Sequence, residues 1–111
     1  MTVHPRLYRP GGAWPRQFTQ FYLGGDLMGS PLHHHDAAAN SLVHGRKLWF
    51  LAPPAAREWS NEAVYEHLVR TDGLPGYARC VQEAGDLLFV PHLWTHAAIC
   101  LEDCIGVAHE L

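Results

Sequence analysis

Histidine is the most prominent metal-binding residue type in this sequence. Nine are present, and three of them are consecutive at positions 33–35, directly before Asp36. If residues 32–36 form a strand, alternate side chains share a face, so His33 and His35 would point to one side. His34 and Asp36 would point to the other side. Either pair offers two adjacent metal ligands from one strand, and spacing alone leaves both pairs open.

A third ligand must come from a distant strand that folds alongside, and His96 is placed to provide it. His96 follows a turn-forming segment and opens the next apolar stretch. Two ligands from one strand and one distant histidine form a facial triad that leaves coordination positions open for substrate. The alternative is a solvated loop that carries the histidines without a metal. The remaining histidines are interpreted as structural: His4, His44, His67, His92 and His109.

Lys47 is a second candidate functional residue, with a possible role in binding a carboxylate. It lies in the run Gly-Arg-Lys-Leu-Trp-Phe-Leu-Ala-Pro-Pro at 45–54, where Gly45 permits a bulge or bend in a strand. A lysine on the inward face is a compact cation that could pair with a carboxylate. The alternative is that Arg46 and Lys47 are solvated charges at a strand edge. Apolar residues fill both alternating sets at 48–51, so this strand is expected to be buried on both faces.

Short β-rich segments, separated by Gly and Pro, must position these side chains. We expect strands near residues 17–23, 32–36, 41–44, 48–51, 80–82, 87–90, 97–100 and 105–109. Ser60 predicts the N-cap of a helix that runs to Arg70, with Val64 and Leu68 on its buried face. The pattern indicates a mainly β fold, a small barrel or sandwich, with one inserted helix near residues 60–70 on its outside.

Length and composition indicate a single globular domain. The 111 residues are 48% hydrophobic and 17% charged, which is enough apolar material for one core and too little charge for a disordered chain. The net charge is −3 and no long Lys/Arg run is present, so no nucleic-acid partner is evident. No apolar run reaches the ~18 residues of a membrane helix, so we expect no membrane span.

Three cysteines and the lack of an apolar leader indicate a reducing compartment. An odd number without a secretory signal argues against a disulfide framework, so we expect an intracellular protein, cytoplasmic or nuclear. Cys100 and Cys104 are four apart in a strand-like stretch, which would place both on one face. They are interpreted as small buried hydrophobes, with a zinc site as the alternative.

The chain divides into an irregular arm at residues 1–16, rich in Pro, Gly and Arg, and a domain at residues 17–111. Both ends are expected to lack elements of a complete domain, because the chain stops at Leu111 within a predicted strand. An open strand edge there could pair with a second copy and give a homodimer.

Several segments, in this order and spacing, resemble the JmjC family. They are Gly-Ser-Pro-Leu-His at 29–33, Asn-Ser-Leu-Val-His-Gly-Arg-Lys-Leu-Trp-Phe-Leu-Ala-Pro-Pro at 40–54, Gln-Glu-Ala-Gly-Asp-Leu-Leu-Phe-Val-Pro at 82–91, Trp-Thr-His at 94–96 and Leu-Glu-Asp at 101–103. The resemblance covers roughly residues 18–110, which is nearly the whole chain.

The resemblance implies a double-stranded β-helix, the cupin or jelly-roll barrel, that binds Fe(II) and 2-oxoglutarate. Such enzymes use dioxygen to hydroxylate a protein side chain or to demethylate a methyl-lysine, so a protein substrate is implied as well. By position, His33 matches the first metal ligand and His96 the last. Lys47 matches the lysine that pairs with the distal carboxylate of 2-oxoglutarate, and Asn40 matches a polar residue near that cosubstrate.

The metal motif departs from the usual His-x-Asp of the family. The family register gives His33 and His35, a His-x-His motif that resembles a subgroup of small JmjC proteins. The register alternative, His34 with Asp36, keeps an intact His-x-Asp. We prefer the first register because the run at 29–33 and its distance to the Gly-Arg-Lys segment both fit the His-x-His subgroup.

Two functions therefore stay open. The first is an Fe(II)- and 2-oxoglutarate-dependent oxygenase of the protein hydroxylase or demethylase type, which Lys47 and His96 favour. The second is a non-catalytic metal- or protein-binding JmjC-like cupin. It is favoured by the His-x-His motif and by the short chain. Cys100, where the family usually has Asn, is a further departure from the family pattern. A three-histidine zinc site with different chemistry is a third interpretation.

Overall fold

The structure is a computed structural model that describes residues 19–110. Its elements in chain order are β1 (Thr19–Gly24), β2 (Gly29–His33), β3 (Ala38–His44), β4 (Arg46–Ala52), the 3-10 helix η2 (Pro54–Ala56), α1 (Val64–Thr71), β5 (Ala78–Glu83), β6 (Leu87–Val90), β7 (Thr95–Cys100) and β8 (Cys104–Glu110). The expected arm at residues 1–16 and the end of the chain at Leu111 lie outside the described residues.

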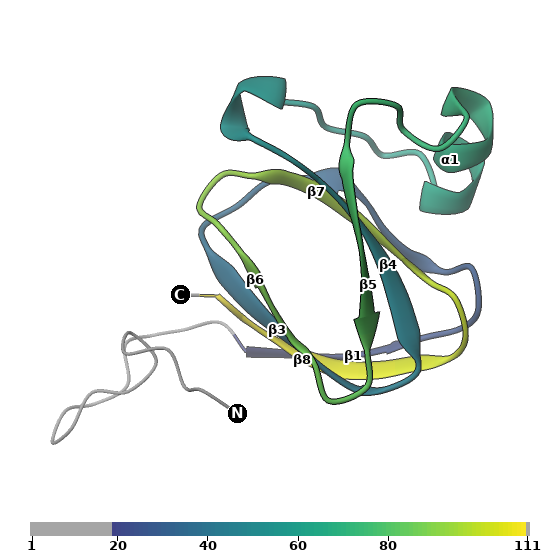
Figure 1. The fold of residues 1–111 in the computed structure, drawn as a ribbon, viewed down its shortest axis with the longest axis vertical. Helices are drawn as coiled ribbons and strands as arrows, with labels where there is room; N and C mark the ends of the chain where they lie inside the picture. Colours follow the sequence, from purple (N-terminus) through teal and green to yellow (C-terminus); the bar gives the residue numbers. More distant parts are fainter. Residues whose placement is uncertain (1–18, 111) are drawn as a thin grey trace, which may run out of the picture.

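The eight strands form two antiparallel four-stranded sheets. Sheet A has the order β1-β8-β3-β6, and sheet B has the order β2-β7-β4-β5. Most successive strands alternate between the two sheets, which is the winding of a double-stranded β-helix. Figure 1 shows the strands wound around one interior, with α1 on the outside. The predicted mainly β jelly-roll fold with one external helix is therefore confirmed.

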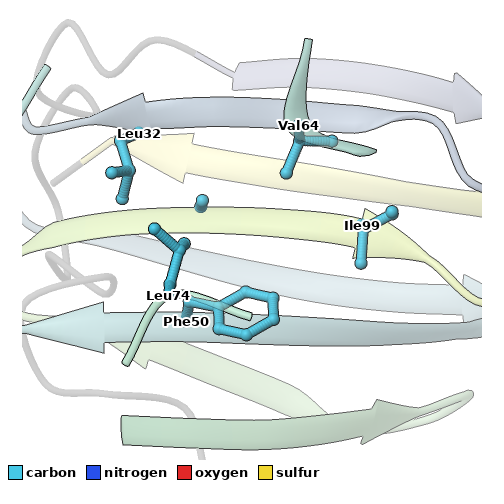
Figure 2. Packing of buried hydrophobic residues seen from close by; sticks show 6 residues of the cluster. Leu32, Phe50, Val64, Leu74 and Ile99 are labelled. Atoms are coloured by element: carbon cyan, nitrogen blue, oxygen red, sulfur yellow. The ribbon is translucent and has the colours of Figure 1, made fainter. Parts of the chain in front are cut away.

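Sheet B carries a hydrophobic core on its outer face, beneath the helix. The cluster joins strand residues to α1 and to the segment that follows it: Leu32, Phe50, Val64, Leu74, Ala97 and Ile99 (Figure 2). Val64 and the partly buried Leu68 are the apolar positions of α1 that face this cluster, as their four-residue spacing predicts. The helix therefore covers one sheet and leaves the interior between the sheets free for polar groups.

The opposite face of sheet B points into the interior. In the pairing of β4 with β7, Lys47 lies opposite Cys100, and Leu51 lies opposite His96. The intervening residues, Leu48 and Phe50, point outward into the cluster beneath α1. Because side chains alternate along a strand, burial of the outward set directs Lys47 and His96 inward. The prediction that this strand is buried on both faces is confirmed.

The helix begins later than the sequence predicted. Its first residue is Val64, and its N-cap Ala63 makes no side-chain capping bond. Ser60, the predicted N-cap, instead accepts the backbone N–H of Glu62 at 3.0 Å and closes a local turn before the helix. With eight residues, α1 is too short to cross a membrane, and no other helix in residues 19–110 is long and apolar enough.

Two strand predictions were wrong in their boundaries. The strand expected over residues 32–36 ends at His33, so His35 lies in the connection to β3. Cys100 and Cys104 do not share one strand: Cys100 ends β7 and Cys104 begins β8. Both are nevertheless buried free thiols in one hydrophobic cluster, which agrees with their interpretation as small core residues.

The last strand is not the open edge that the sequence suggested. β8 lies between β1 and β3 and pairs with both, so its backbone groups are used within sheet A. The edges of the described sheets are β1 and β6 in sheet A, and β2 and β5 in sheet B. A homodimer stays a prediction, but pairing through β8 does not support it.

We expect Phe50→Ala to lower the free energy of unfolding by about 3–5 kcal/mol, because the ring is only 2% exposed and joins both central strands to the helix. Urea denaturation would measure the change. Phe21→Ala is the matched control, because the Phe21 ring is 63% exposed. Equal losses in the two variants would show that the cluster beneath α1 does not dominate stability.

Candidate metal centre

Three histidine rings converge at one end of the interior. Ring centroids are separated by 4.1 Å for His33 and His96, 4.8 Å for His35 and His96, and 5.2 Å for His33 and His35. One nitrogen from each ring lies within 4.8 Å of the other two. In the described residues this is the single group of three or more His, Cys, Asp or Glu side chains with such spacing. Small inward shifts would bring these nitrogens to the ~2.1 Å of a metal–imidazole bond.

A bulge in β2 brings His33 opposite His96. The register between β2 and β7 shifts after Ser30, and pairing resumes at His33 with His96. Pro31 lies in this interval, and β2 is an edge strand, where a residue without an N–H is tolerated. The bulge also lets Leu32 point outward into the cluster beneath α1. Local backbone geometry therefore places the two histidines side by side.

A tight turn before β7 holds His35 in place. Leu93 has a left-handed backbone conformation, with a φ of 61°, and its N–H donates to the carbonyl of His35 at 2.9 Å. The same turn is closed by the N–H of Trp94, which donates to Pro91 O at 3.2 Å. A non-glycine residue with this φ is uncommon and is retained where the surrounding structure requires it. Here the turn ties the connection after β2 to the start of β7, beside His96.

Backbone carbonyls orient all three rings in the same way. The Nδ1 atoms of His33, His35 and His96 lie 2.6, 2.6 and 2.8 Å from the carbonyl oxygens of Pro31, Asp36 and Trp94, respectively. A carbonyl oxygen only accepts, so each Nδ1 carries the proton and donates. Each Nε2 is left with its lone pair, and a fixed Nδ1–H bond of this kind is typical of metal-binding histidines. The donor set therefore fits a divalent metal ion.

Burial keeps two of these imidazoles neutral. Desolvation, assisted by the neighbouring His33, lowers the pKa of His96 to about 4. Desolvation also lowers the pKa of His33, and the nearby His35 lowers it further. An imidazole binds a metal through its neutral form. Both rings therefore have a free lone pair at neutral pH.

The residues of the alternative register, His34 and Asp36, do not form a similar cluster with His96. The His34 ring packs against Trp59, with ring centroids 5.6 Å apart. Asp36 instead faces His92, with Oδ1 at 3.2 Å from Nδ1. Neither His34 nor Asp36 joins His96 in the described structure. The geometry therefore favours the first register, His33 with His35, as the one to test.

A cavity of about 500 Å³ connects the histidines to Lys47. Lys47 is 6% exposed and is the only lysine of the sequence. Its Nζ lies 3.9 Å from the ring centroid of Tyr22 and 5.0 Å from that of Trp49. Burial lowers its pKa, and no carboxylate pairs with it among residues 19–110. A cation held only by aromatic faces in a cavity provides a site for an anionic ligand.

Tyr22 is a cavity residue that the sequence analysis missed. Its hydroxyl donates to Asn40 Oδ1 at 2.7 Å, and burial raises its pKa to about 12, so it stays protonated. Gly106 leaves room for the Tyr22 hydroxyl, because a Cβ at residue 106 would lie 2.2 Å from the hydroxyl oxygen. The period-two pattern of the first strand was the available signal, since it places Gln20 and Tyr22 on one face. Asn40, which was expected near a cosubstrate, does line the cavity.

Gln82 is a second residue that the sequence analysis missed. Its buried side chain accepts the indole N–H of Trp49 at 2.9 Å and donates to the backbone carbonyls of Asn40 and Asp86 at 2.9 and 3.1 Å. These bonds link β4 and β5 of sheet B to β3 of sheet A. They fix the Trp49 ring, which lies 6.1 Å from the His96 ring and also contacts Lys47.

Comparison with known proteins agrees with this architecture. Residues 70–111 match the family model described as JmjC domain, hydroxylase. The chain is similar to the arginine-specific demethylase JMJ20 of Arabidopsis thaliana, at 33% identity over 80% of this chain and 22% of that protein. It is also similar to human JmjC domain-containing protein 8, at 32% identity over 79% of this chain and 36% of that protein. The chain thus spans between about a fifth and a third of the length of these relatives.

Solved structures show the same fold. A cupin superfamily protein from Desulfitobacterium hafniense aligns with a TM-score of 0.58 at 10% identity, over 90% of this chain and 71% of that one. The ribosomal oxygenase YcfD from Escherichia coli aligns with a TM-score of 0.59 at 16% identity, over 81% of this chain and 21% of that one. The fold is that of the cupins. The resemblance predicted from the sequence is confirmed, and the chain is a JmjC-type cupin domain.

The low pKa of His96 predicts that the metal-free protein loses stability in acid. In the unfolded chain this histidine takes up a proton near pH 6.5, whereas in the folded protein it does so only near pH 4. The free energy of unfolding is therefore highest above about pH 6.5, and the stability held by neutral His96 is lost as the pH falls from there through 4. The expected loss is on the order of 3 kcal/mol. Denaturant unfolding with a chelator present would measure it at several pH values.

His96→Leu should flatten this pH dependence, because it removes the buried titrating group. His44→Gln is the control, since His44 is exposed and is not one of the three converging rings. A profile that is equally steep in His96→Leu and in the wild type would contradict the assignment.

Proposed function

We propose that this domain is an Fe(II)- and 2-oxoglutarate-dependent oxygenase that acts on a protein side chain. One observation carries the proposal: three converging imidazoles and the only lysine of the chain line the same cavity. A metal site with open positions and a buried cation beside it suit a ligand that chelates at one end and carries a carboxylate at the other.

His33, His35 and His96 would hold the metal through their Nε2 atoms. Three imidazoles on one side leave the positions facing the cavity open for ligands. Bound Fe(II), together with 2-oxoglutarate, supplies the activation of dioxygen. The chain's own contribution is to fix the three rings through the carbonyls of Pro31, Asp36 and Trp94.

Lys47 would bind the distal carboxylate of 2-oxoglutarate. A buried ammonium gains most from an anionic partner, because water does not compensate its charge. The Tyr22 ring beneath Nζ and the Trp49 ring beside it exclude water and limit the directions in which the amine can move. Asn40, oriented by the Tyr22 hydroxyl, would contribute a polar contact near the same carboxylate.

The substrate class follows from the relatives by analogy. One relative is named an arginine-specific demethylase, another a lysine-specific demethylase, and a structural neighbour a ribosomal oxygenase. These names support a protein substrate for this chain, whether the outcome is hydroxylation or demethylation.

A non-catalytic metal- or protein-binding cupin is the second candidate. It is favoured by the donor set, because the three converging groups are all imidazoles and include no carboxylate. Such a set also suits zinc or another divalent ion. Turnover of 2-oxoglutarate would separate the two functions.

We expect Lys47→Ala to weaken 2-oxoglutarate binding by about 10- to 100-fold while metal binding is largely retained, since a hydrogen-bonded charge contributes roughly 1.5–3 kcal/mol. Isothermal titration into anaerobic Fe(II)-loaded protein, with Mn(II) as the oxygen-inert substitute, would measure both affinities. Arg46→Ala is the control, because Arg46 is adjacent in sequence but points outward toward Glu102. Equal loss of metal and 2-oxoglutarate binding would contradict the role assigned to Lys47.

Release of CO₂ from 2-oxoglutarate without a protein substrate is expected for the Fe(II)-loaded wild type. His96→Ala should abolish it, because the variant removes a ligand. Saturable binding of 2-oxoglutarate without any decarboxylation would favour the non-catalytic cupin.

A further inference from the structure

The proposed metal site lacks a negative charge in its ligand set. Three neutral imidazoles leave both positive charges of a divalent ion uncompensated in a partly dehydrated cavity, where charge is costly. Lys47, which lines the same cavity, adds a further positive charge. An acidic side chain near the rings would reduce this cost. Among the described residues that line the cavity, one carries a carboxylate, and it is Glu110.

Glu110 lies at the histidine end of the cavity. It is the last residue of β8, and its backbone lies opposite Ala38 of β3, the strand that begins just after His35. The carboxylate Oε1 is 3.8 Å from Nδ1 of His35. The same Nδ1 lies 2.6 Å from Asp36 O. Glu110 therefore faces the protonated edge of the ring, the side opposite the Nε2 that would bind a metal.

We propose that Glu110 is a positioning residue for the metal site, acting through the imidazole of His35. The proposal rests on the proposed function, because it requires that His35 be a ligand. The carboxylate attracts the Nδ1–H that the Asp36 carbonyl already orients, and in this way makes Nε2 a stronger donor. A carboxylate or carbonyl behind a metal-bound histidine commonly changes metal affinity by 10- to 100-fold.

Glu110 also determines the charge of the loaded cavity. A divalent ion, the Lys47 ammonium and the Glu110 carboxylate sum to a charge of +2. A dianionic ligand such as 2-oxoglutarate brings the cavity to neutrality, whereas a monoanion leaves an excess positive charge. Without Glu110 the excess would be one unit larger in either case. The carboxylate at this position therefore suits a cavity that takes a divalent ion together with a dicarboxylate.

Metal titration of three variants tests the proposal. Glu110→Gln keeps the shape and removes the charge, Glu110→Asp keeps the charge, and Glu83→Gln removes one charge from an exposed position outside the cavity. Mn(II) affinity would be measured by isothermal titration without 2-oxoglutarate, and thermal unfolding of the metal-free proteins would report on folding. We expect Glu110→Gln to bind Mn(II) about tenfold more weakly, with Glu83→Gln unchanged and Glu110→Asp largely restored.

The outcomes separate this proposal from the function on which it rests. Wild-type affinity in Glu110→Gln, in a protein whose His96→Ala variant has lost Mn(II), would overturn the role of Glu110 and leave the metal site standing. Equal weakening in Glu110→Gln and Glu83→Gln would also overturn it, because the effect would then be one of net charge. Absence of Mn(II) binding in the wild type would overturn the metal site itself.

Discussion

The antiparallel pairing of β4 with β7 is the constraint on which the rest of the structure depends. It joins the two central strands of sheet B and assigns every side chain on them to one of two faces. Phe50 and Ala97 point outward beneath α1, so Lys47 and His96 must point inward. A shift of one residue in this register would exchange the hydrophobic core with the cavity. The burial that stabilises the sheet therefore also selects the polar residues that face the interior.

The candidate site is built where regular pairing stops. His33 closes a bulge in the edge strand β2, and His35 lies beyond the end of that strand. His96 follows a turn with a left-handed residue, Leu93. Irregular backbone at these points exposes carbonyl groups that are not used in the ladder, and three such carbonyls orient the rings. The regular strands hold the site in place, and the irregular backbone between them sets the orientation of the three rings.

The apolar residues at 48–51 were enough to predict a strand buried on both faces, but they left open whether Lys47 points inward, which the pairing of β4 with β7 decides. The composition of the chain and its Gly and Pro positions likewise predicted the mainly β fold and the external helix. The start of that helix was missed because the Ser60 hydroxyl bonds within a turn, while its N–H donates to Leu32 O at 3.0 Å, a contact that is distant in sequence. The roles of Tyr22, Gln82 and Glu110 depend on contacts between strands that are far apart in sequence, such as β1 with β8. A period-two pattern groups Tyr22 with Gln20, but no local pattern contains that register, so these contacts could be found only in the folded structure.

Trp49 gives the cavity an internal optical probe. Its indole lies 5.0 Å from Nζ of Lys47 and 6.1 Å from the His96 ring, and its N–H is held by Gln82. The emission of an indole responds to nearby charge and to quenching by metal ions. A ligand at the lysine end and an ion at the histidine end would therefore change the fluorescence of the same fixed chromophore. The packing of Trp49 thus places one indole within reach of both halves of the cavity.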